Sequence, residues 1–325
     1  MTKFVNEIGE IAVEAFVCQF EPLTNYQWFG RVSRAGENEH LTFRLSLFDE
    51  DLLRRDFAAV PQIAPDLIEL ATIVYAVDRT IQPDEMSHCQ VQVVMPVRCP
   101  ELLSQQDVHD KLCEILYWYT GYEWHFDFHQ RKKPVRDAEK PQLFNWYDHS
   151  TPVDVALWSG GLDCLAGLYN RAFESRERKF ILCGTGASKT VCGLQKRIVS
   201  LLPDDLIHRV KLQQVYYELE TISGSLPDDA RMRSRGFTFM LIGAICAYLE
   251  GSRVLQVYEN GIGAINLRFR ESEVGLNHAR SVHPLSLMTI AMWLTQILGE
   301  PFKLSNPYLF QTKAQMCQIF SSEED

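Results

Sequence analysis

Residues 153–173 read VDVALWSGGLDCLAGLYNRAF, an apolar strand that runs through Ser-Gly-Gly-Leu-Asp directly into a helix. Gly160 and Gly161 can adopt backbone angles that are barred to other residues, and they let the main chain approach a ligand closely. The N–H groups that open the helix point at an anion, and Asp163 is placed where a carboxylate can bridge to magnesium. The spacing matches neither the dinucleotide fingerprint GxGxxG nor the Walker loop GxxxxGK[ST]. The stretch therefore predicts a phosphate-binding loop of another kind.

This loop resembles the SGGxDS loop of the PP-loop ATP pyrophosphatases, which cleave ATP between the α and β phosphates and transfer AMP to an oxygen of the substrate. Cys164 departs from the family pattern, because a weak thiol donor replaces the serine hydroxyl. The alternative interpretation is a simple turn between strand and helix. Apolar residues at helical spacing after the loop favour the functional interpretation. They are Leu162, Leu165, Ala166, Tyr169 and Phe173.

Length and composition are those of a globular protein, and 325 residues favour two domains. The formal net charge of -10 argues against holding long nucleic acid through counterion release. The nine cysteines form no CxxC pair, so we expect a reduced, cytoplasmic chain. Acidic residues at Glu7, Glu10 and Glu14 argue against a secretory signal. The longest apolar run, 237–249, is too short to span a bilayer.

The first half mixes two periodicities and indicates an α+β module over 1–148, connector included. Alternation predicts strands over 41–47 and 122–128, and longer apolar runs predict buried helices over 67–77 and 108–119. The segment between His129 and Pro152 is polar and contains proline, which is typical of a domain boundary. A second domain is therefore expected over 149–325.

Strands and helices alternate in the second half. The predicted strands are 153–158, 179–183, 209–215 and 253–258, and the predicted helices include a run to Leu202 and a long one over 233–250. This order predicts a parallel sheet covered on both faces. Ligands of such sheets bind beyond the carboxyl ends of the strands. Ser159–Cys164, Gly184–Lys189 and Glu259–Gly261 follow three of these strands and are candidate site segments.

Several longer stretches carry a closer resemblance. They are DLIELATIVYAVDRTI, VVMPV and YWYTGYEWHF in the first half, and RSRGFTFMLIGAICAYLEG, VYENGIGAINL, HARSVHPLS and NPYLFQTKAQM in the second. The second half resembles the QueC-like branch of the PP-loop superfamily, the 7-cyano-7-deazaguanine synthases. The first half resembles the extra module of the QatC type, encoded in bacterial anti-phage defence operons. The resemblance implies an α/β PP-loop domain, adenine nucleotide alpha hydrolase-like, preceded by an α+β module.

The resemblance also implies an activity. The synthase uses ATP and magnesium to adenylate the carboxylate of a 7-deazaguanine, and an amine then attacks the acyl adenylate to give an amide. In the parent enzyme the amine is ammonia, and a second ATP converts the amide to a nitrile. The extra module suggests that a partner protein from the same operon supplies the amine. We expect no membrane among the partners.

Roles for single residues follow from the same resemblance. The implied ATP-binding residues are Leu157, Trp158, Ser159, Gly160, Gly161, Leu162, Asp163, Cys164, Gly184 and Lys189, with Leu157 and Trp158 contacting adenine through their backbone. The implied catalytic residues are Asp163, Arg235 and Lys313, and Asp163 also holds magnesium. The implied substrate-binding residues are Arg233, Glu259, Asn260, Gly261, Asn266, His278 and His283.

Each role has a structural alternative. Arg233 and Arg235 are also explained as solvated charges at the start of a helix, and Glu-Asn-Gly is a common turn sequence. His278 and His283 fit polar loop positions equally well, and Lys189 and Lys313 fit an exposed surface. Thr312 and Gln315 form a predicted capping box at the start of the last helix.

The C-terminal cysteine cluster that holds a structural zinc in the family is missing, because only Cys317 follows Lys313. Two other functions therefore stay open beside the ligase. A tRNA-modifying PP-loop enzyme would need a basic surface, for which only Arg131 to Lys133 offer anything. A non-catalytic scaffold of a defence complex is favoured by Cys164 and the missing cysteines, whereas Asp163, Arg235 and Lys313 argue against it.

Overall fold

A computed structural model describes residues 12–37, 39–54, 59–83, 87–132, 136–140, 153–227, 232–266 and 280–321. The strands of the first half are β1 (Val13–Pro22), β2 (Gln27–Arg34), β3 (His40–Phe48), β4 (His88–Val97) and β5 (Glu123–Gln130). Its helices are α1 (Glu50–Leu53), α2 (Ile63–Thr80), α3 (Pro100–Leu103), α4 (Gln106–Thr120) and the 3₁₀ turn η1 (Asp137–Glu139). The predicted strands over 41–47 and 122–128 and helices over 67–77 and 108–119 are confirmed.

The second half alternates strands and helices as predicted. Its strands are β6 (Val153–Leu157), β7 (Lys179–Gly186), β8 (Val210–Ser223), β9 (Val254–Gln256) and β10 (Lys303–Ser305). Its helices are α5 (Leu162–Glu174), α6 (Lys189–Ser200), α7 (Asp204–Ile207), α8 (Arg235–Leu249), α9 (Gly261–Ile265), α10 (Pro284–Leu298), α11 (Lys313–Met316) and the 3₁₀ turn η3 (Cys317–Phe320).

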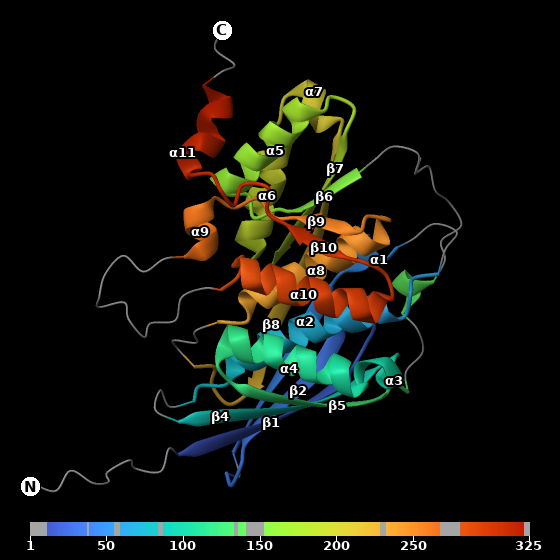
Figure 1. Cartoon of the computed structure of the whole chain (residues 1–325). Coiled ribbons are helices and arrows are strands. Elements are labelled where there is room, and N and C mark those ends of the chain that lie inside the picture. Colours follow the sequence, from blue (N-terminus) through green and yellow to red (C-terminus); the bar gives the residue numbers. More distant parts are fainter. Residues whose placement is uncertain are drawn as a thin grey trace, which may run out of the picture.

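All these strands belong to one ten-stranded sheet with the order β10-β9-β6-β7-β8-β3-β2-β1-β4-β5 (Figure 1). Neighbouring strands of the second half are parallel, whereas β8 and β3, β3 and β2, and β2 and β1 pair antiparallel. The predicted α/β class is therefore confirmed, with a mixed and mostly parallel sheet. The carboxyl ends of β6, β7 and β9 share one edge of the sheet, which is where the candidate segments lie.

Alternate residues of the parallel strands face two separate cores. Val155 and Ile181 belong to the larger core, which also contains the buried sides of α2, α4, α8 and α10. Ala156 and Leu182 belong to a smaller core with α5 and α7 (Figure 1). Both faces of the parallel part are thus covered, as predicted. Among the described helices, none combines the length and apolar character needed to cross a membrane.

Helix α5 forms where it was predicted, and its predicted apolar face is confirmed in part, because Ala166 is buried and Leu165 and Tyr169 pack against the smaller core. Leu162 and Phe173 are 50% and 72% exposed, whereas Asp163, Cys164 and Leu168 are buried. The glycine loop sets the rotation of the helix, because Asp163 accepts a hydrogen bond from Asn260 and the Cys164 thiol contacts Ser159. The contacts at the loop thus accompany the exposure of the first and last residues of the predicted apolar face, Leu162 and Phe173.

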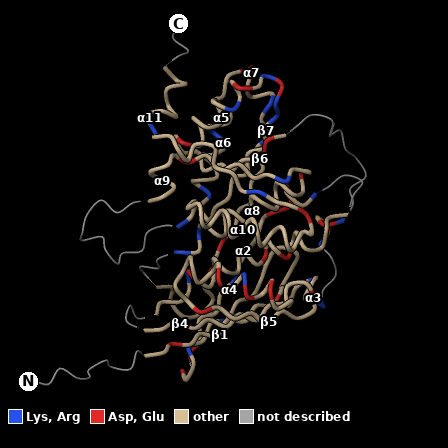
Figure 2. The backbone as a smooth tube through the Cα atoms, in the orientation of Figure 1, with Lys and Arg blue, Asp and Glu red and all other residues tan. Residues whose placement is uncertain are grey.

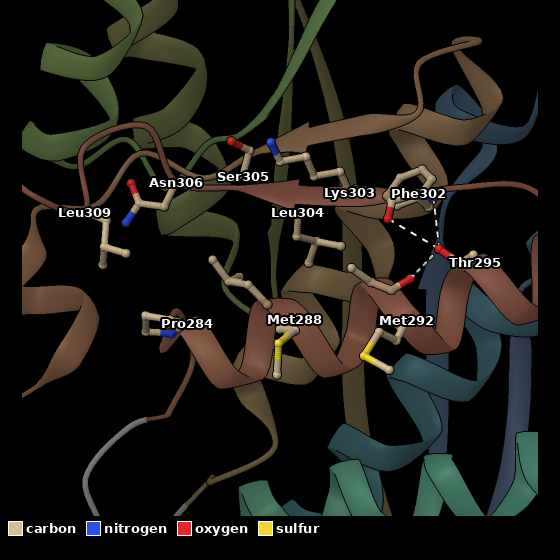
Figure 3. A pocket seen from close by; sticks show the side chains of 12 residues that line it. Pro284, Met288, Met292, Thr295, Phe302, Lys303, Leu304, Ser305, Asn306 and Leu309 are labelled. Carbon is tan, nitrogen blue, oxygen red and sulfur yellow. Dashed lines mark hydrogen bonds between the residues drawn. The ribbon is translucent and has the colours of Figure 1, made fainter.

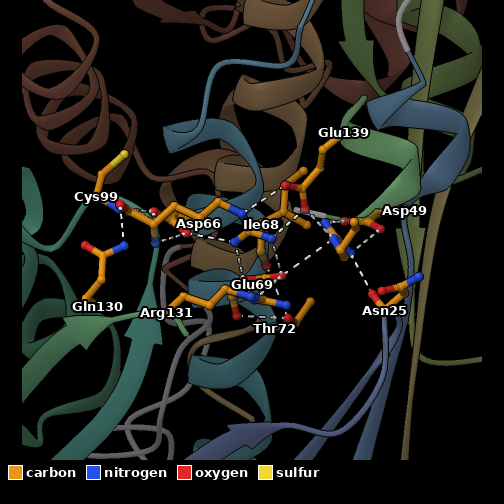
Figure 4. A network of polar contacts seen from close by, with 12 residues as sticks. Asn25, Asp49, Asp66, Ile68, Glu69, Thr72, Cys99, Gln130, Arg131 and Glu139 are labelled. Carbon is orange, nitrogen blue, oxygen red and sulfur yellow. Dashed lines mark hydrogen bonds and ion pairs between the residues drawn. The ribbon is translucent and has the colours of Figure 1, made fainter. Parts of the chain in front are cut away.

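Charged residues of both signs are spread over the fold (Figure 2), and one group of them is buried together in the first half (Figure 4). Its members are Asp49, Asp66, Glu69, Arg98, Arg131, Arg136 and Glu139. Arg98 lies just after β4 and forms ion pairs with Asp66, Glu69 and Glu139 at 2.8, 2.8 and 2.5 Å. The network ties the segment around η1 to α2 and the end of β4.

The energetics of this network depend on complete pairing. Burial raises the pKa of Asp66 to about 6. Burial alone would also raise the pKa of Glu69, but the neighbouring guanidinium groups of Arg98 and Arg136 outweigh it and lower that pKa. Buried charges of this kind stabilise a fold only while every partner is present.

The two halves meet along β8. Residues 210–216 of this strand pair with β7, and residues 216–223 pair with β3 of the first half. Helices α2 and α8 also pack on each other across this junction. The division at 148/149 stays a prediction, because residues 141–152 lie outside the described residues. The described halves nevertheless share one sheet and one large core.

Asp78 at this junction leads to a prediction about pH. Its buried carboxylate accepts hydrogen bonds from the Ser234 backbone N–H and hydroxyl at 2.7 and 2.8 Å. Burial nevertheless raises its pKa to about 6, above the value of about 3.9 for an exposed aspartate. The stability that Asp78 contributes is therefore complete below about pH 4 and is lost as the pH rises through about 6.

We expect thermal unfolding of the wild type and Asp78→Asn at pH 4.5 and pH 7 to show this loss. The wild type should lose stability relative to the variant as the pH rises, because the amide cannot ionise. A difference in melting temperature that stays constant between the two pH values would contradict the prediction.

Candidate functional site

The glycine loop between β6 and α5 has the geometry of an anion cradle. Gly160 has a φ of 74°, in the left-handed region that favours glycine. Gly161 precedes the first turn of α5, and its N–H donates to the Ser159 hydroxyl at 3.1 Å. The first backbone N–H groups of the 13-residue helix α5 have no partner within the helix and are oriented to receive an anion.

Cys164 occupies the end of this loop as a buried thiol. Its sulfur lies 3.2 Å from the Ser159 hydroxyl oxygen. Burial raises the pKa of the thiol, which therefore stays protonated. Cys164 thus keeps the contact within the loop through a thiol, which is a weak hydrogen-bond donor.

Four side chains far apart in the sequence meet beside the loop. Asn260 Nδ2 donates to Asp163 Oδ2 at 2.9 Å and to Glu259 Oε1 at 2.8 Å. Lys313 Nζ lies 3.2 Å from Asp163 Oδ1. Asp163 and Asn260 are buried, whereas the Lys313 side chain is 55% exposed. The structure thus brings together one predicted residue after β6, two after β9 and one from α11.

The pKa values of the two carboxyl groups of this cluster are shifted in opposite directions. Burial and the neighbouring Asp163 raise the pKa of Glu259 to about 7. Burial alone would raise the pKa of Asp163 as well, but hydrogen bonds with Glu259, Asn260 and Lys313 outweigh it and lower the pKa. Asp163 is therefore the more acidic partner, and Glu259 is the carboxyl group that takes up a proton as the pH falls through about 7.

The predicted magnesium role of Asp163 fits this donor set. Magnesium prefers oxygen ligands and commonly takes one or two carboxylates together with phosphate oxygens and water. Asp163 and Glu259 supply two such carboxyl groups beside the N-terminus of α5. A metal ion here would take the place of the proton on Glu259 and compete with Lys313 for Asp163.

The segment 306–316 holds Lys313 over α5. Asn306 Nδ2 donates to the Glu259 carbonyl at 2.9 Å, and the Gly261 N–H donates to the Gln311 carbonyl at 2.8 Å. The predicted capping box of Thr312 and Gln315 is confirmed and starts α11 at Lys313. These contacts explain how a residue 150 positions after Asp163 reaches its carboxylate.

Gly261 packs tightly against the segment 306–316, and replacing this glycine tests the importance of that contact. A Cβ at this position would lie 2.1 Å from the Leu309 carbonyl oxygen, so the backbone of one segment must move. We expect Gly261→Ala to shift the segment that carries Lys313 and to lower ATP affinity or turnover at least about tenfold, as small displacements near a reacting centre do. Isothermal titration with ATP and turnover measurements check this.

Gly263→Ala is an instructive companion variant. Its Cβ would meet the Glu259 carboxylate at 2.2 Å, a side chain rather than backbone. It should disturb Glu259 and leave segment 306–316 in place. Equal ATP binding and turnover in the wild type and Gly261→Ala would contradict the proposed role of this contact.

No family model, curated protein or solved structure matches the chain.

Other predicted nucleotide-binding residues lie around the loop in different settings. The Trp158 N–H donates to the Cys183 carbonyl at 2.9 Å, and its carbonyl accepts from Gln195 Nε2 at 2.9 Å, so protein partners already use both backbone groups. The Leu157 side chain packs against Gly243 in α8. Gly184 pairs with Gln214 of β8 and lies beside Gln195, where a Cβ would lie 2.4 Å from the amide oxygen.

The remaining predicted basic residues contact other parts of the fold. Lys189 lies 3.5 Å from Glu218 and over the Tyr216 ring. Arg233 donates to the Thr120 carbonyl at 2.6 Å and lies over Tyr122, both in the first half. Arg235 is exposed at the start of α8, with its guanidinium 5.0 Å from the centre of the Phe239 ring.

The other predicted substrate-binding residues are Asn266, His283 and His278. Asn266 ends α9 in the left-handed conformation with a φ of 51°. His283 caps α10, where its Nδ1 accepts from the Leu285 N–H at 3.2 Å. His278 lies outside the described residues. Neither Asn266 nor His283 has a contact with Asp163 among those the structure describes.

A groove of about 690 Å³ adjoins the site at the edge of the sheet (Figure 3). It lies between β10 and α10, with Met288 and Met292 on the helix side and Leu304 on the strand side. Asn306 and Leu309 line one end, and both belong to the segment that contacts Glu259 and Gly261. The groove and the candidate site therefore share one wall.

Two residues of the site escaped the sequence analysis. Asn306 lies in the NPYLFQTKAQM stretch, where its amide was a detectable polar signal beside Lys313. Gln195 lies in an amphipathic helix and belongs to none of the quoted motifs, so the sequence contains no signal for it.

Proposed function

We propose that the chain is an ATP-dependent carbon–nitrogen ligase that forms an acyl adenylate, with release of pyrophosphate, and passes the acyl group to an amine. The convergence of Asp163, Asn260, Glu259 and Lys313 beside a glycine loop carries this proposal. A turn that only joined a strand to a helix would have no need for a lysine held at Asp163 by a separate segment.

In the first step, adenylation of the substrate, the residues of the site have separate roles. A substrate carboxylate oxygen attacks the α-phosphorus of ATP, the bond to the β-phosphate bridging oxygen breaks, and pyrophosphate leaves with the electron pair. The N–H groups of α5 and the Lys313 ammonium balance the charge on the departing group. Asp163 and Glu259 would hold magnesium, which supplies further neutralisation of phosphate charge when bound.

The second step needs an amine close to the acyl carbon. The amine nitrogen forms the new bond to that carbon, AMP leaves with the electron pair of the acyl–oxygen bond, and the nitrogen loses a proton. Asn260 is assigned to positioning Asp163 rather than to reading substrate, because its amide bonds Asp163, Glu259 and the Gly263 N–H.

The family resemblance supplies the substrate class. It favours a 7-deazaguanine carboxylate as the acid, and ammonia or an amine of a partner protein from a defence operon as the acceptor. A mass increase of the partner protein that requires both ATP and the acid would identify a protein acceptor. Amide product with ammonia alone would identify the small amine.

The decisive experiment measures pyrophosphate and AMP release from ATP and magnesium with and without 7-carboxy-7-deazaguanine, for the wild type and Asp163→Ala. We expect release that is stimulated by the acid in the wild type and lost in the variant. ATP binding without any release would refute the ligase and favour the scaffold. Release stimulated by tRNA instead of the acid would favour the tRNA-modifying enzyme.

A further inference from the structure

Helix α6 buries a polar residue in place of an apolar one. Gln195 is 1% exposed and is the one residue of α6 that is fully buried, whereas the adjacent Leu194 is 50% exposed. Burying an amide is costly unless its hydrogen bonds are made. A helix that exposes leucine to bury glutamine departs from the usual amphipathic pattern, and such departures concentrate at functional sites.

The contacts of Gln195 join three neighbouring strands beside the glycine loop. Its Nε2 donates to the Trp158 carbonyl at 2.9 Å, and its Oε1 accepts from Gln214 Nε2 of β8 at 2.8 Å. Its own carbonyl accepts from the Trp158 indole N–H at 3.4 Å. The Oε1 also lies against Gly184 at the end of β7. One side chain thus connects the end of β6 with its neighbours β7 and β8.

Trp158 is the last residue before the glycine loop, so its carbonyl sets the direction in which the loop leaves the strand. Gly160 packs on the same glutamine, since a Cβ there would lie 3.5 Å from Gln195 Cγ. The glycines at 160 and 184 therefore flank Gln195 on two sides. Loss of the amide would leave the Trp158 carbonyl and the Gln214 amide without these partners.

We propose that Gln195 is a positioning residue of the nucleotide site and fixes the glycine loop through Trp158 and Gly184. This inference rests on the proposed function, because it assumes that the loop binds ATP. Gln195 itself acts through the backbone of the loop. It should therefore affect ATP affinity more than the rate of the chemical steps.

The test compares Gln195→Met with Gln213→Met. Methionine keeps the length of the side chain and removes both hydrogen bonds. Gln213 is an equally buried amide on the opposite face of the sheet, where it bonds Glu250 at 2.6 Å and Cys246 at 3.0 Å. Both variants should lower the melting temperature. Only Gln195→Met should raise the Kd and KM for ATP, by about tenfold or more, with kcat changed less than threefold.

Gly184→Ala provides a second variant that leaves Gln195 intact. Its Cβ would lie 2.4 Å from Gln195 Oε1 and would displace the amide. It should also weaken ATP binding, and it keeps the test decisive if Gln195→Met does not fold. ATP affinity within twofold of the wild type in the folded variants would overturn the inference, as would an equal loss in Gln213→Met.

The two proposals fail in different ways. A wild type that binds ATP but releases no pyrophosphate with the acid refutes the ligase, while the comparison of Kd values still decides the role of Gln195. A wild type with acid-stimulated release and an unaffected Gln195→Met refutes only the positioning role. A wild type that does not bind ATP refutes both.

Discussion

Replacing Lys313 with methionine is expected to lower acid-dependent pyrophosphate release by about 100- to 1,000-fold, the usual cost of removing one group that stabilises charge in a transition state. The Lys313 ammonium lies 3.2 Å from Asp163 Oδ1, beside the N-terminus of α5. Methionine is unbranched and uncharged, and its side chain is only one atom shorter than that of lysine. The capping box of Thr312 and Gln315 stays in place, so α11 should still form.

Lys303→Met is the matched control for this experiment. Lys303 is an exposed lysine of β10 that lines the neighbouring groove, and it is ten positions from Lys313. It should keep nearly full activity, because it does not belong to the Asp163 cluster. Turnover of Lys313→Met equal to that of the wild type would remove this lysine from the mechanism.

Replacing Arg98 with methionine is expected to lower the free energy of unfolding by about 3–5 kcal/mol, as the loss of one partner from a buried ion pair does. Arg98 is 8% exposed and donates to Asp66, Glu69 and Glu139. Without it these carboxylates stay buried with fewer cations. Urea unfolding followed by circular dichroism measures the effect.

Arg44→Met serves as the comparison for this variant. Arg44 pairs with Glu220 at 3.1 Å, with side chains that are 40% and 66% exposed. Its loss should cost less than about 1 kcal/mol, as for other surface pairs. Similar small losses in both variants would mean that the buried network is not a major source of stability.

Local pattern predicted six of the ten strands that the structure describes, whereas β1, β2, β4 and β10 were not predicted. Alternation at Leu41, Phe43, Leu45 and Leu47 identified β3, and glycines after an apolar strand identified the loop before α5. Both features arise from neighbouring residues. The capping box at Thr312 was predictable for the same reason.

Features that depend on distant residues were not predictable in this way. Strand β8 was expected to end near Val215, but it continues to Ser223 because β3 supplies a partner for its second part. The rotation of α5 depends on Asn260, about 100 positions later. The contacts of Gln195 exist only in the folded chain, where β6, β7 and β8 lie side by side.

The candidate site falls between these two cases. Asp163, Glu259, Asn260 and Lys313 were each proposed from their own stretch, and the structure places them in contact. Arg233 was proposed on the same grounds, yet it contacts the first half of the chain. Position at a strand end is therefore informative, whereas a charge at a helix start is ambiguous.

The division of β8 between two partners also constrains how this protein arose. Separation of the chain at residue 148 would strip residues 216–223 of their hydrogen-bonded neighbour and expose an edge prone to aggregation. A gene fusion that brought a new N-terminal module would have to supply an antiparallel strand in the same register. The two halves are therefore expected to be inherited together, as one evolutionary unit.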